Sequence, residues 1–96
     1  MLFEWDNRKN VGNQEKHGIS FETAQLVFND PYQLSIQDRH VDGEERWQTI
    51  GEISGIAIVI VAHTFRERDG EEVIRLISAR QATKQERQRY EQAKFD

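Results

Sequence analysis

Basic side chains gather near the end of this chain, where a predicted strand gives way to a predicted helix. Residues 80–94 carry five basic and two acidic side chains, although the whole chain has a formal net charge of −4. Residues 19–65, in contrast, carry two arginines and seven acidic residues. A guanidinium grips two phosphate oxygens at once and stays charged at neutral pH. The distribution predicts that a polyanion would meet the C-terminal third of the chain.

Phosphate binding and proton transfer are the chemistry that these residue types could perform. Histidine suits proton transfer because its unperturbed pKa is about 6.5, and the two candidates are His17 and His63. The candidate phosphate ligands are Arg46, Arg66, Arg68, Arg75 and Arg80.

Strand alternation limits which arginines can share a site. In a regular strand Arg75 lies on the face opposite Arg80, because the two are five residues apart. They can line one site only if the strand ends or bulges near Ser78 and Ala79. A helix cap at Thr83 favours an early end, which would place Arg80 in the junction.

Each candidate also has a structural interpretation. Arg75 could pair with a carboxylate, and Arg80 could clamp the start of the terminal helix. His17 could complement a helix C-terminus, and His63 could be a hydrogen-bonded core histidine. The loop acids Asp38, Asp42, Glu44 and Glu45 match no known metal-binding loop, and we predict no metal site there.

The elements that must position these residues follow from caps, turns and apolar patterns. Strands are expected over 2–5, 34–36, 46–53, 56–65 and 73–79, with 56–65 central because it is apolar on both faces. Helices are expected over 7–17, over 20–30 from an N-cap at Ser20, and from a Thr83/Glu86 capping box to about Lys94. Residues 66–70 read as a charged loop. The order favours an antiparallel sheet with helices segregated on it, an α+β fold.

Length and composition favour a single domain over residues 1–96. The chain has no cysteine, which fits a reducing compartment. Its first residues lack the pattern of a signal peptide, and its longest apolar run, 56–62, is too short to span a bilayer. We therefore expect a cytoplasmic protein without membrane contact.

Motifs along nearly the whole chain resemble the BrnT family, the ribonuclease toxins of BrnT/BrnA toxin–antitoxin pairs. The order and spacing of these motifs carry the resemblance, since each alone would be weak. They are Lys16-His17-Gly18-Ile19-Ser20-Phe21, Phe28, Asp30-Pro31, Glu45-Arg46, Arg75, Ile77-Ser78-Ala79-Arg80, Ala82, Glu86-Arg87 and Tyr90. The segment 11–14 departs from the pattern, because a more apolar helix is expected there.

The resemblance implies a RelE-like fold of four to five antiparallel strands, with two N-terminal helices and one C-terminal helix. It also implies an endoribonuclease that inhibits translation and is neutralised by a BrnA-like antitoxin with a ribbon-helix-helix part. DNA would be reached only through that antitoxin, for which the acidic stretch 19–65 offers a binding surface.

Metal-independent RNA cleavage needs a base, an acid and cations that stabilise the phosphate in the transition state. No cofactor is expected. We predict catalytic roles for Lys16, His17, Arg75 and Arg80, and RNA binding by Arg46, Arg66, Arg68, Lys84 and Arg87. The alternative is a non-catalytic interaction module that binds a DNA-binding partner through its sheet and its basic helix.

Overall fold

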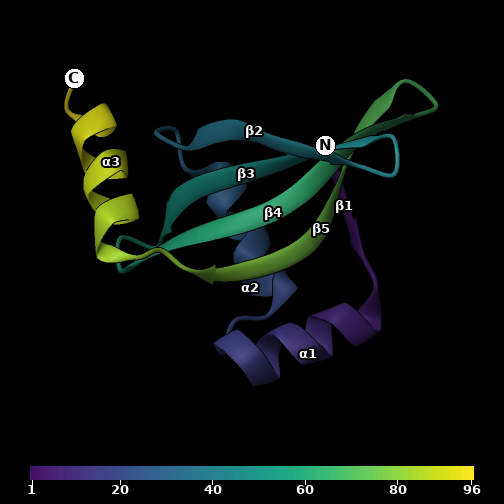
Figure 1. Cartoon of the computed structure of the whole chain (residues 1–96), viewed down its shortest axis with the longest axis horizontal. Helices are drawn as coiled ribbons and strands as arrows, with labels where there is room; N and C mark the ends of the chain where they lie inside the picture. The colour runs from purple at the N-terminus through teal and green to yellow at the C-terminus, as the bar shows by residue number, and fades with distance from the viewer.

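Five strands and three helices follow one another in the predicted order (Figure 1). The computed structural model describes all residues, 1–96. Strand β1 (Leu2–Trp5) leads into helix α1 (Asn7–His17), helix α2 (Phe21–Ala24) and the 3₁₀ segment η1 (Gln25–Asn29). Strands β2 (Leu34–Val41), β3 (Glu44–Ile53), β4 (Ala57–Arg68) and β5 (Glu71–Gln81) precede helix α3 (Lys84–Lys94). The α+β prediction is confirmed.

Helix α1 has its predicted bounds although only one of its residues is aliphatic. The Asp6 carboxylate accepts the backbone N–H groups of Arg8 and Lys9, and Gly18 ends the helix in the left-handed conformation at φ 71°. Two asparagines, Asn10 and Asn13, are buried where apolar residues would be expected. The helix is therefore anchored by hydrogen bonds more than by apolar burial.

The side-chain amide of Asn13 makes the hydrogen bonds that a neighbouring strand would otherwise make with β5. Its Nδ2 donates to the carbonyl oxygen of Ala79 at 2.8 Å, and its Oδ1 accepts the Ala79 N–H at 3.0 Å. β1 pairs with β5 only from Val73 to Leu76, so the edge of β5 beyond Leu76 lacks a strand partner. The Asn13 amide satisfies part of that edge and fixes α1 against it.

The second predicted helix is shorter than expected. Only α2 is α-helical, and the chain tightens into η1 before Asp30. This tighter segment packs closely on β3, where a Cβ atom on Gly51 would lie 2.8 Å from Cγ1 of Val27. Glycine at position 51 therefore allows η1 to approach the sheet.

The sheet has the strand order β1-β5-β4-β3-β2. Strands β2 to β5 form the predicted antiparallel meander, and β4 is central as expected from its apolar sequence. β1 adds a parallel strand at the edge, with Leu2 opposite Val73 and Trp5 opposite Leu76. That pairing joins the N-terminal strand to the last strand of the chain.

Strands β4 and β5 run further than predicted. The expected loop 66–70 shrinks to a two-residue turn at Asp69 and Gly70, whose φ angles of 54° and 80° suit a tight hairpin. β5 continues to Gln81, with Arg80 opposite Ile60. The prediction that Arg80 lies in a junction beyond the strand is wrong, because pairing with β4 holds this segment in the sheet.

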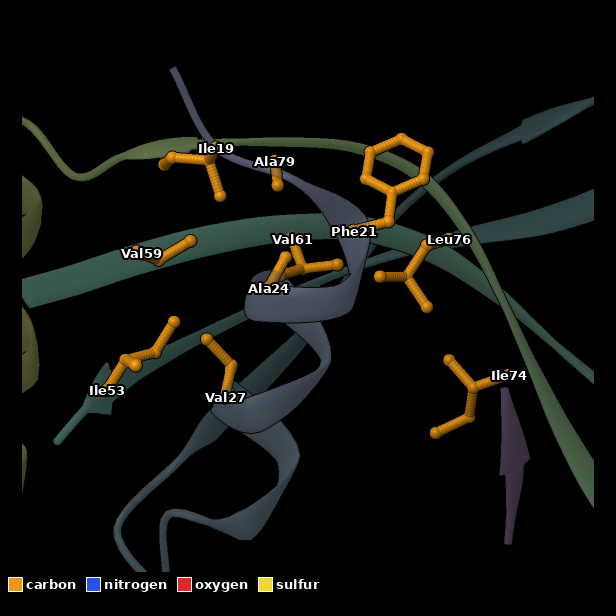
Figure 2. Close-up of a cluster of buried hydrophobic side chains, with 10 residues drawn as sticks. All are labelled: Ile19, Phe21, Ala24, Val27, Ile53, Val59, Val61, Ile74, Leu76 and Ala79. Carbon is orange, nitrogen blue, oxygen red and sulfur yellow. The ribbon is translucent and has the colours of Figure 1, made fainter. Parts of the chain in front are cut away.

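The two faces of the sheet are covered differently. The inner face, as we call it, packs against α1, α2 and η1, and a dry core of aliphatic and aromatic side chains fills the space (Figure 2). Ten buried residues form this core: Ile19, Phe21, Ala24, Val27, Ile53, Val59, Val61, Ile74, Leu76 and Ala79.

The opposite, outer face is covered only at one end, by α3 (Figure 1). Tyr90 of α3 packs on Ile50 and Ile60, and its hydroxyl donates to the carboxylate of Asp30. Burial raises the pKa of the Tyr90 phenol, and the Asp30 carboxylate adds to that shift. This bond fixes α3 to the segment after η1. No helix covers the rest of the outer face.

Candidate nucleic-acid interface

A β-bulge places Arg75 and Arg80 on the same face of the sheet. Ser78 lies opposite Ala62 and Leu76 lies opposite His63, so Ile77 is an extra residue in β5. Arg75 is therefore opposite Thr64, and Arg80 is opposite Ile60. Thr64 and Ile60 are four residues apart on one strand and share a face, which is the outer one. The sequence predicts that both arginines can line one site only if the strand ends or bulges near Ser78, and the structure shows a bulge there.

Four predicted arginines meet on this face and form what we call the outer arginine cluster: Arg46, Arg66, Arg68 and Arg75. They come from three adjacent strands, β3, β4 and β5. No one segment of sequence holds them together, and the meander alone brings them side by side. Their side chains are between 26% and 57% exposed, and Arg46 is the most buried of the four, with its Nε shielded from solvent.

The carboxylate of Glu4 lies among three of these arginines. Its Oε2 is 3.0 Å from Nη2 of Arg68, and its Oε1 is 3.7 Å from Nη1 of Arg75 and 3.9 Å from Nη1 of Arg66. The hydrogen bond from Arg68 holds the pKa of Glu4 below its usual value, against the opposing effect of burial. Glu4 therefore stays ionised, and its charge offsets the repulsion among the three guanidinium groups.

Glu44 plays a similar part from β3. Its Oε2 accepts from Nη2 of Arg66 at 3.0 Å, and its Oε1 is 3.9 Å from Nε of Arg46. Two carboxylates thus lie between four guanidinium groups, and the cluster keeps an excess of positive charge.

Glu4 is the residue at this site that sequence reasoning missed. The alternation in Leu2-Phe3-Glu4-Trp5 does indicate that Glu4 faces away from Phe3 and Trp5. The sequence gives no sign that β1 pairs with β5, however, because the two strands are about seventy residues apart. The sequence places Glu44 in a group of loop acids, whereas in the structure its carboxylate faces Arg46 and Arg66.

Arg80 is engaged by a different partner. Its Nη1 and Nη2 donate to Oε1 and Oε2 of Glu86 at 2.7 Å and 2.9 Å, a two-pronged ion pair. This hydrogen bonding lowers the pKa of Glu86 to about 2. The Glu86 carboxylate also accepts the N–H of Thr83 in the predicted capping box. These contacts are those of the structural clamp that the sequence left open as the alternative for Arg80.

The other predicted site residues lie outside the outer arginine cluster. Lys16 and His17 form the last turn of α1, and neither bonds to an arginine of the cluster. Lys84 and Arg87 are exposed on α3. Their predicted roles stay predictions.

His63 belongs to the inner face. Its side chain is fully buried, and its ring meets Phe28 and Phe65 edge-on at centroid distances of 5.0 and 4.9 Å. Nε2 lies 2.7 Å from Oγ1 of Thr49. Burial lowers the pKa of His63 to about 4, so the ring is neutral at pH 7. His63 is the buried, hydrogen-bonded histidine of the structural interpretation.

The comparisons with known proteins bear on the family and the fold of the chain. Residues 5–86 match the family model described as ribonuclease toxin, BrnT, of type II toxin–antitoxin system. The chain belongs to this family. Its fold is similar to the 1.1 Å crystal structure of the Brucella abortus ribonuclease toxin BrnT, with a TM-score of 0.63 and 25% sequence identity over 88% of this chain and 100% of that one. None of the curated proteins matches it. The resemblance first seen in its motifs is confirmed.

Membership in the BrnT family makes this chain the toxin of a toxin–antitoxin system, and it implies an antitoxin partner. No helix in the structure is long and apolar enough to cross a membrane.

Proposed function

We propose that this BrnT-family chain is an endoribonuclease that cleaves RNA by metal-independent acid–base chemistry, with the scissile phosphate on the outer arginine cluster. One observation carries the proposal: four arginines from three strands lie side by side on the part of the outer face that α3 leaves uncovered. Guanidinium groups fixed before the substrate arrives can stabilise the charge that develops on a phosphate in the transition state. These groups could meet that need without a metal ion.

The reaction would be an attack of a ribose 2′-oxygen on the adjacent phosphorus. A base takes the 2′-hydroxyl proton, the bond from phosphorus to the 5′-oxygen breaks, and an acid protonates that oxygen. The products are a 2′,3′-cyclic phosphate and a 5′-hydroxyl. Glu4 and Glu44, which lie beside the arginines, are the candidates for the proton transfers at this site, and Arg75 is the central phosphate ligand in this proposal. Lys16 and His17 end α1, which packs against the inner face, so a role for them would lie in contacts with RNA away from the scissile phosphate.

Translation would stop because messenger or ribosomal RNA is cut in the cytoplasm. A BrnA-like antitoxin with a ribbon-helix-helix part would neutralise the toxin, and its basic segments would suit the acidic stretch 19–65. Lys84 and Arg87 on α3 would extend the RNA track beyond the cluster.

The test is cleavage of a mixed-sequence RNA in EDTA by the wild-type chain and by Arg75→Ala. We expect 2′,3′-cyclic ends from the wild type and a loss of about 10²–10³-fold in rate for the variant, the range for removing one group that stabilises transition-state charge. Matched thermal melting would show that the variant is folded.

Equal cleavage by both proteins would expose a contaminating nuclease or an irrelevant Arg75. Absence of cleavage by a folded wild type, with and without ribosomes, would overturn the enzyme proposal. Retained binding of the antitoxin in that case would support the interaction module.

A further inference from the structure

A small groove opens on the outer face between the sheet and α3. Its volume is about 150 Å³. The floor is formed by Ile50 and Ile60, which are 8% and 7% exposed, and Tyr90 of α3 forms a wall. Leu34 and Ile36 of β2 line the other side. An apolar slot of this size holds one flat ring and is too small for the face of a partner helix.

The rim of the groove is polar. Gln48, Glu86 and Arg89 complete its lining. Glu86 is already neutralised by Arg80. Gln48 makes only a long contact, 3.5 Å from Nε2 to Oδ2 of Asp38, and can turn its amide toward a ligand. An amide offers both a donor and an acceptor, whereas the Arg89 guanidinium offers donors only.

The groove is continuous with the outer arginine cluster. Along β3 the outward side chains are Arg46, Gln48 and Ile50 in turn, spaced about 7 Å apart along the strand. The row across the sheet at Gln48 continues with Ala62 and Ser78, both small residues. On β4 and β5, therefore, only small side chains separate the arginines of the cluster from the apolar floor.

A nucleobase has the shape and the chemistry that this groove requires. Its two faces are flat and suited to apolar contact, and its edge carries hydrogen-bond donors and acceptors. Unstacked bases of single-stranded RNA are held in this way, by contact on their faces and hydrogen bonds at their edges. A base in the groove would belong to a nucleotide next to a phosphate on the cluster.

We propose that the groove beneath α3 binds one base of the RNA substrate, with Gln48 and Arg89 at its polar edge, and so selects where the strand is cut. This rests on the proposed ribonuclease function and adds a specificity site to it. The occupant is a nucleobase because the groove adjoins the arginine cluster and because the Arg89 cation at its rim suits a polyanion.

The test compares the binding of two uncleavable oligonucleotides of equal length. One is a 2′-deoxy strand with mixed bases, and the other is a 2′-deoxy strand in which every nucleotide lacks its base. Wild type should bind the base-bearing strand about tenfold more tightly, the effect of one stacked base. Ile36→Trp would fill the groove from its lip, where Ile36 is 51% exposed. This variant should bind both strands as weakly as wild type binds the abasic one.

Matched controls separate the groove from the cluster. Ile56→Trp adds the same ring at a residue that is 88% exposed in the β3–β4 turn and should keep the tenfold preference. Arg75→Ala should weaken binding of both strands equally. Should Ile36→Trp fail to fold, Gln48→Ala and Arg89→Ala take its place, with a reduced preference expected.

Equal binding of both strands by wild type, or no binding of either, would overturn the base site. So would an Ile36→Trp variant that keeps the preference, including one that loses its antitoxin instead. RNA cleavage in EDTA is scored separately, so a folded wild type that cleaves without preferring the base-bearing strand would refute the groove and leave the proposed function standing.

Discussion

The inner and outer faces of the sheet are made from the same strands, yet one is a buried core and the other carries partly exposed charged side chains. The inner face excludes water: its core side chains are buried, and even its histidine is held neutral. The outer face keeps its arginines partly exposed to solvent and bridges them with two carboxylates, Glu4 and Glu44. Alternate residues of β3, β4 and β5 serve each face. Stability is concentrated on the helix-covered side, which leaves the other side free for binding.

The largest effect should come from the inner face. Phe21 is fully buried, and its ring lies 6.0 Å from that of Trp5, centroid to centroid. Phe21→Ala should lower the free energy of unfolding by about 3–5 kcal/mol, since it removes a buried ring and leaves a cavity. Urea denaturation followed by tryptophan fluorescence would measure this.

Leu26→Ala is the matched control, because Leu26 lies in the adjoining η1 but is 40% exposed. Its cost should stay below about 1 kcal/mol. Similar costs for the two variants would contradict the assignment of stability to the buried side of α2.

His63 should give the inner face a distinctive pH dependence. Its pKa is about 4 in the folded chain and 6.5 as the reference value for an unfolded one. Between these values the unfolded chain binds a proton that the folded chain does not. Stability should therefore fall as the pH drops through this window, by up to about 1.4 kcal/mol per pH unit, and should be unaffected by this group above it.

His63→Gln removes the titration and keeps a polar side chain near Thr49. This variant should lose most of the slope between pH 6.5 and 5, measured by urea denaturation at each pH. Below about pH 4.5 the carboxylates with lowered pKa values, such as Glu86, also begin to cost stability. An unchanged slope in the variant would assign the pH dependence to other groups.

Sequence reasoning succeeded where structure is specified locally. The bounds of α1 and α3 follow from Asp6, Gly18 and the Thr83/Glu86 box, and these caps read directly from the chain. The meander follows from short turns between apolar runs. The sequence also names the four arginines of the outer cluster as candidate phosphate ligands; the structure shows that they lie together, and their role stays a prediction.

Pairing between strands far apart in the chain could not be predicted from the sequence. The position of β1 beside β5, and with it the contacts of Glu4, depends on pairing between the first and last strands, about seventy residues apart. The face shared by Arg75 and Arg80 depends on one extra residue, Ile77, which no local signal marks as a bulge. Two-residue periodicity therefore gives the wrong face for any residue beyond an unrecognised bulge.

Arg80 lies on the outer face but pairs with Glu86 of α3, so its substitution tests whether it contributes to stability or to RNA binding. Arg80→Ala should lower the free energy of unfolding by about 1 kcal/mol, the value for a half-exposed ion pair with good geometry. Cleavage of RNA should fall only severalfold if Arg80 acts as a clamp. Glu86→Gln, which keeps an oxygen for the cap but removes the charge, should give a similar loss of stability.

Thermal melting and the EDTA cleavage assay, applied to both variants, decide between the two roles. A loss of about 10²-fold or more in cleavage by a fully stable Arg80→Ala protein would restore the predicted catalytic role. It would also extend the phosphate site from the arginine cluster to the base of α3.

The smallest effect should come from Glu4→Gln, and it tests how the outer face is balanced. Removing this carboxylate frees Arg68 and Arg75 from a competing anion, so binding of a 2′-deoxy oligonucleotide should tighten severalfold. The slope of log K against log salt should steepen by about 0.7 for each additional phosphate contact with a single strand. Stability should change little, because the lost ion pairs are partly exposed.

The rate of RNA cleavage by Glu4→Gln distinguishes two roles of the Glu4 carboxylate: balancing the charge of the arginines, or acting as the general base. If Glu4 only balances the charge of the arginines, cleavage at limiting substrate should rise together with binding. If it takes the 2′-hydroxyl proton, cleavage should fall by about 10²-fold or more while binding still tightens. Weaker binding by Glu4→Gln would contradict both, and would mean that the arginines need their carboxylate partner to stay in place. The outer face would then depend on its ion pairs for shape, as the inner face depends on its packed core.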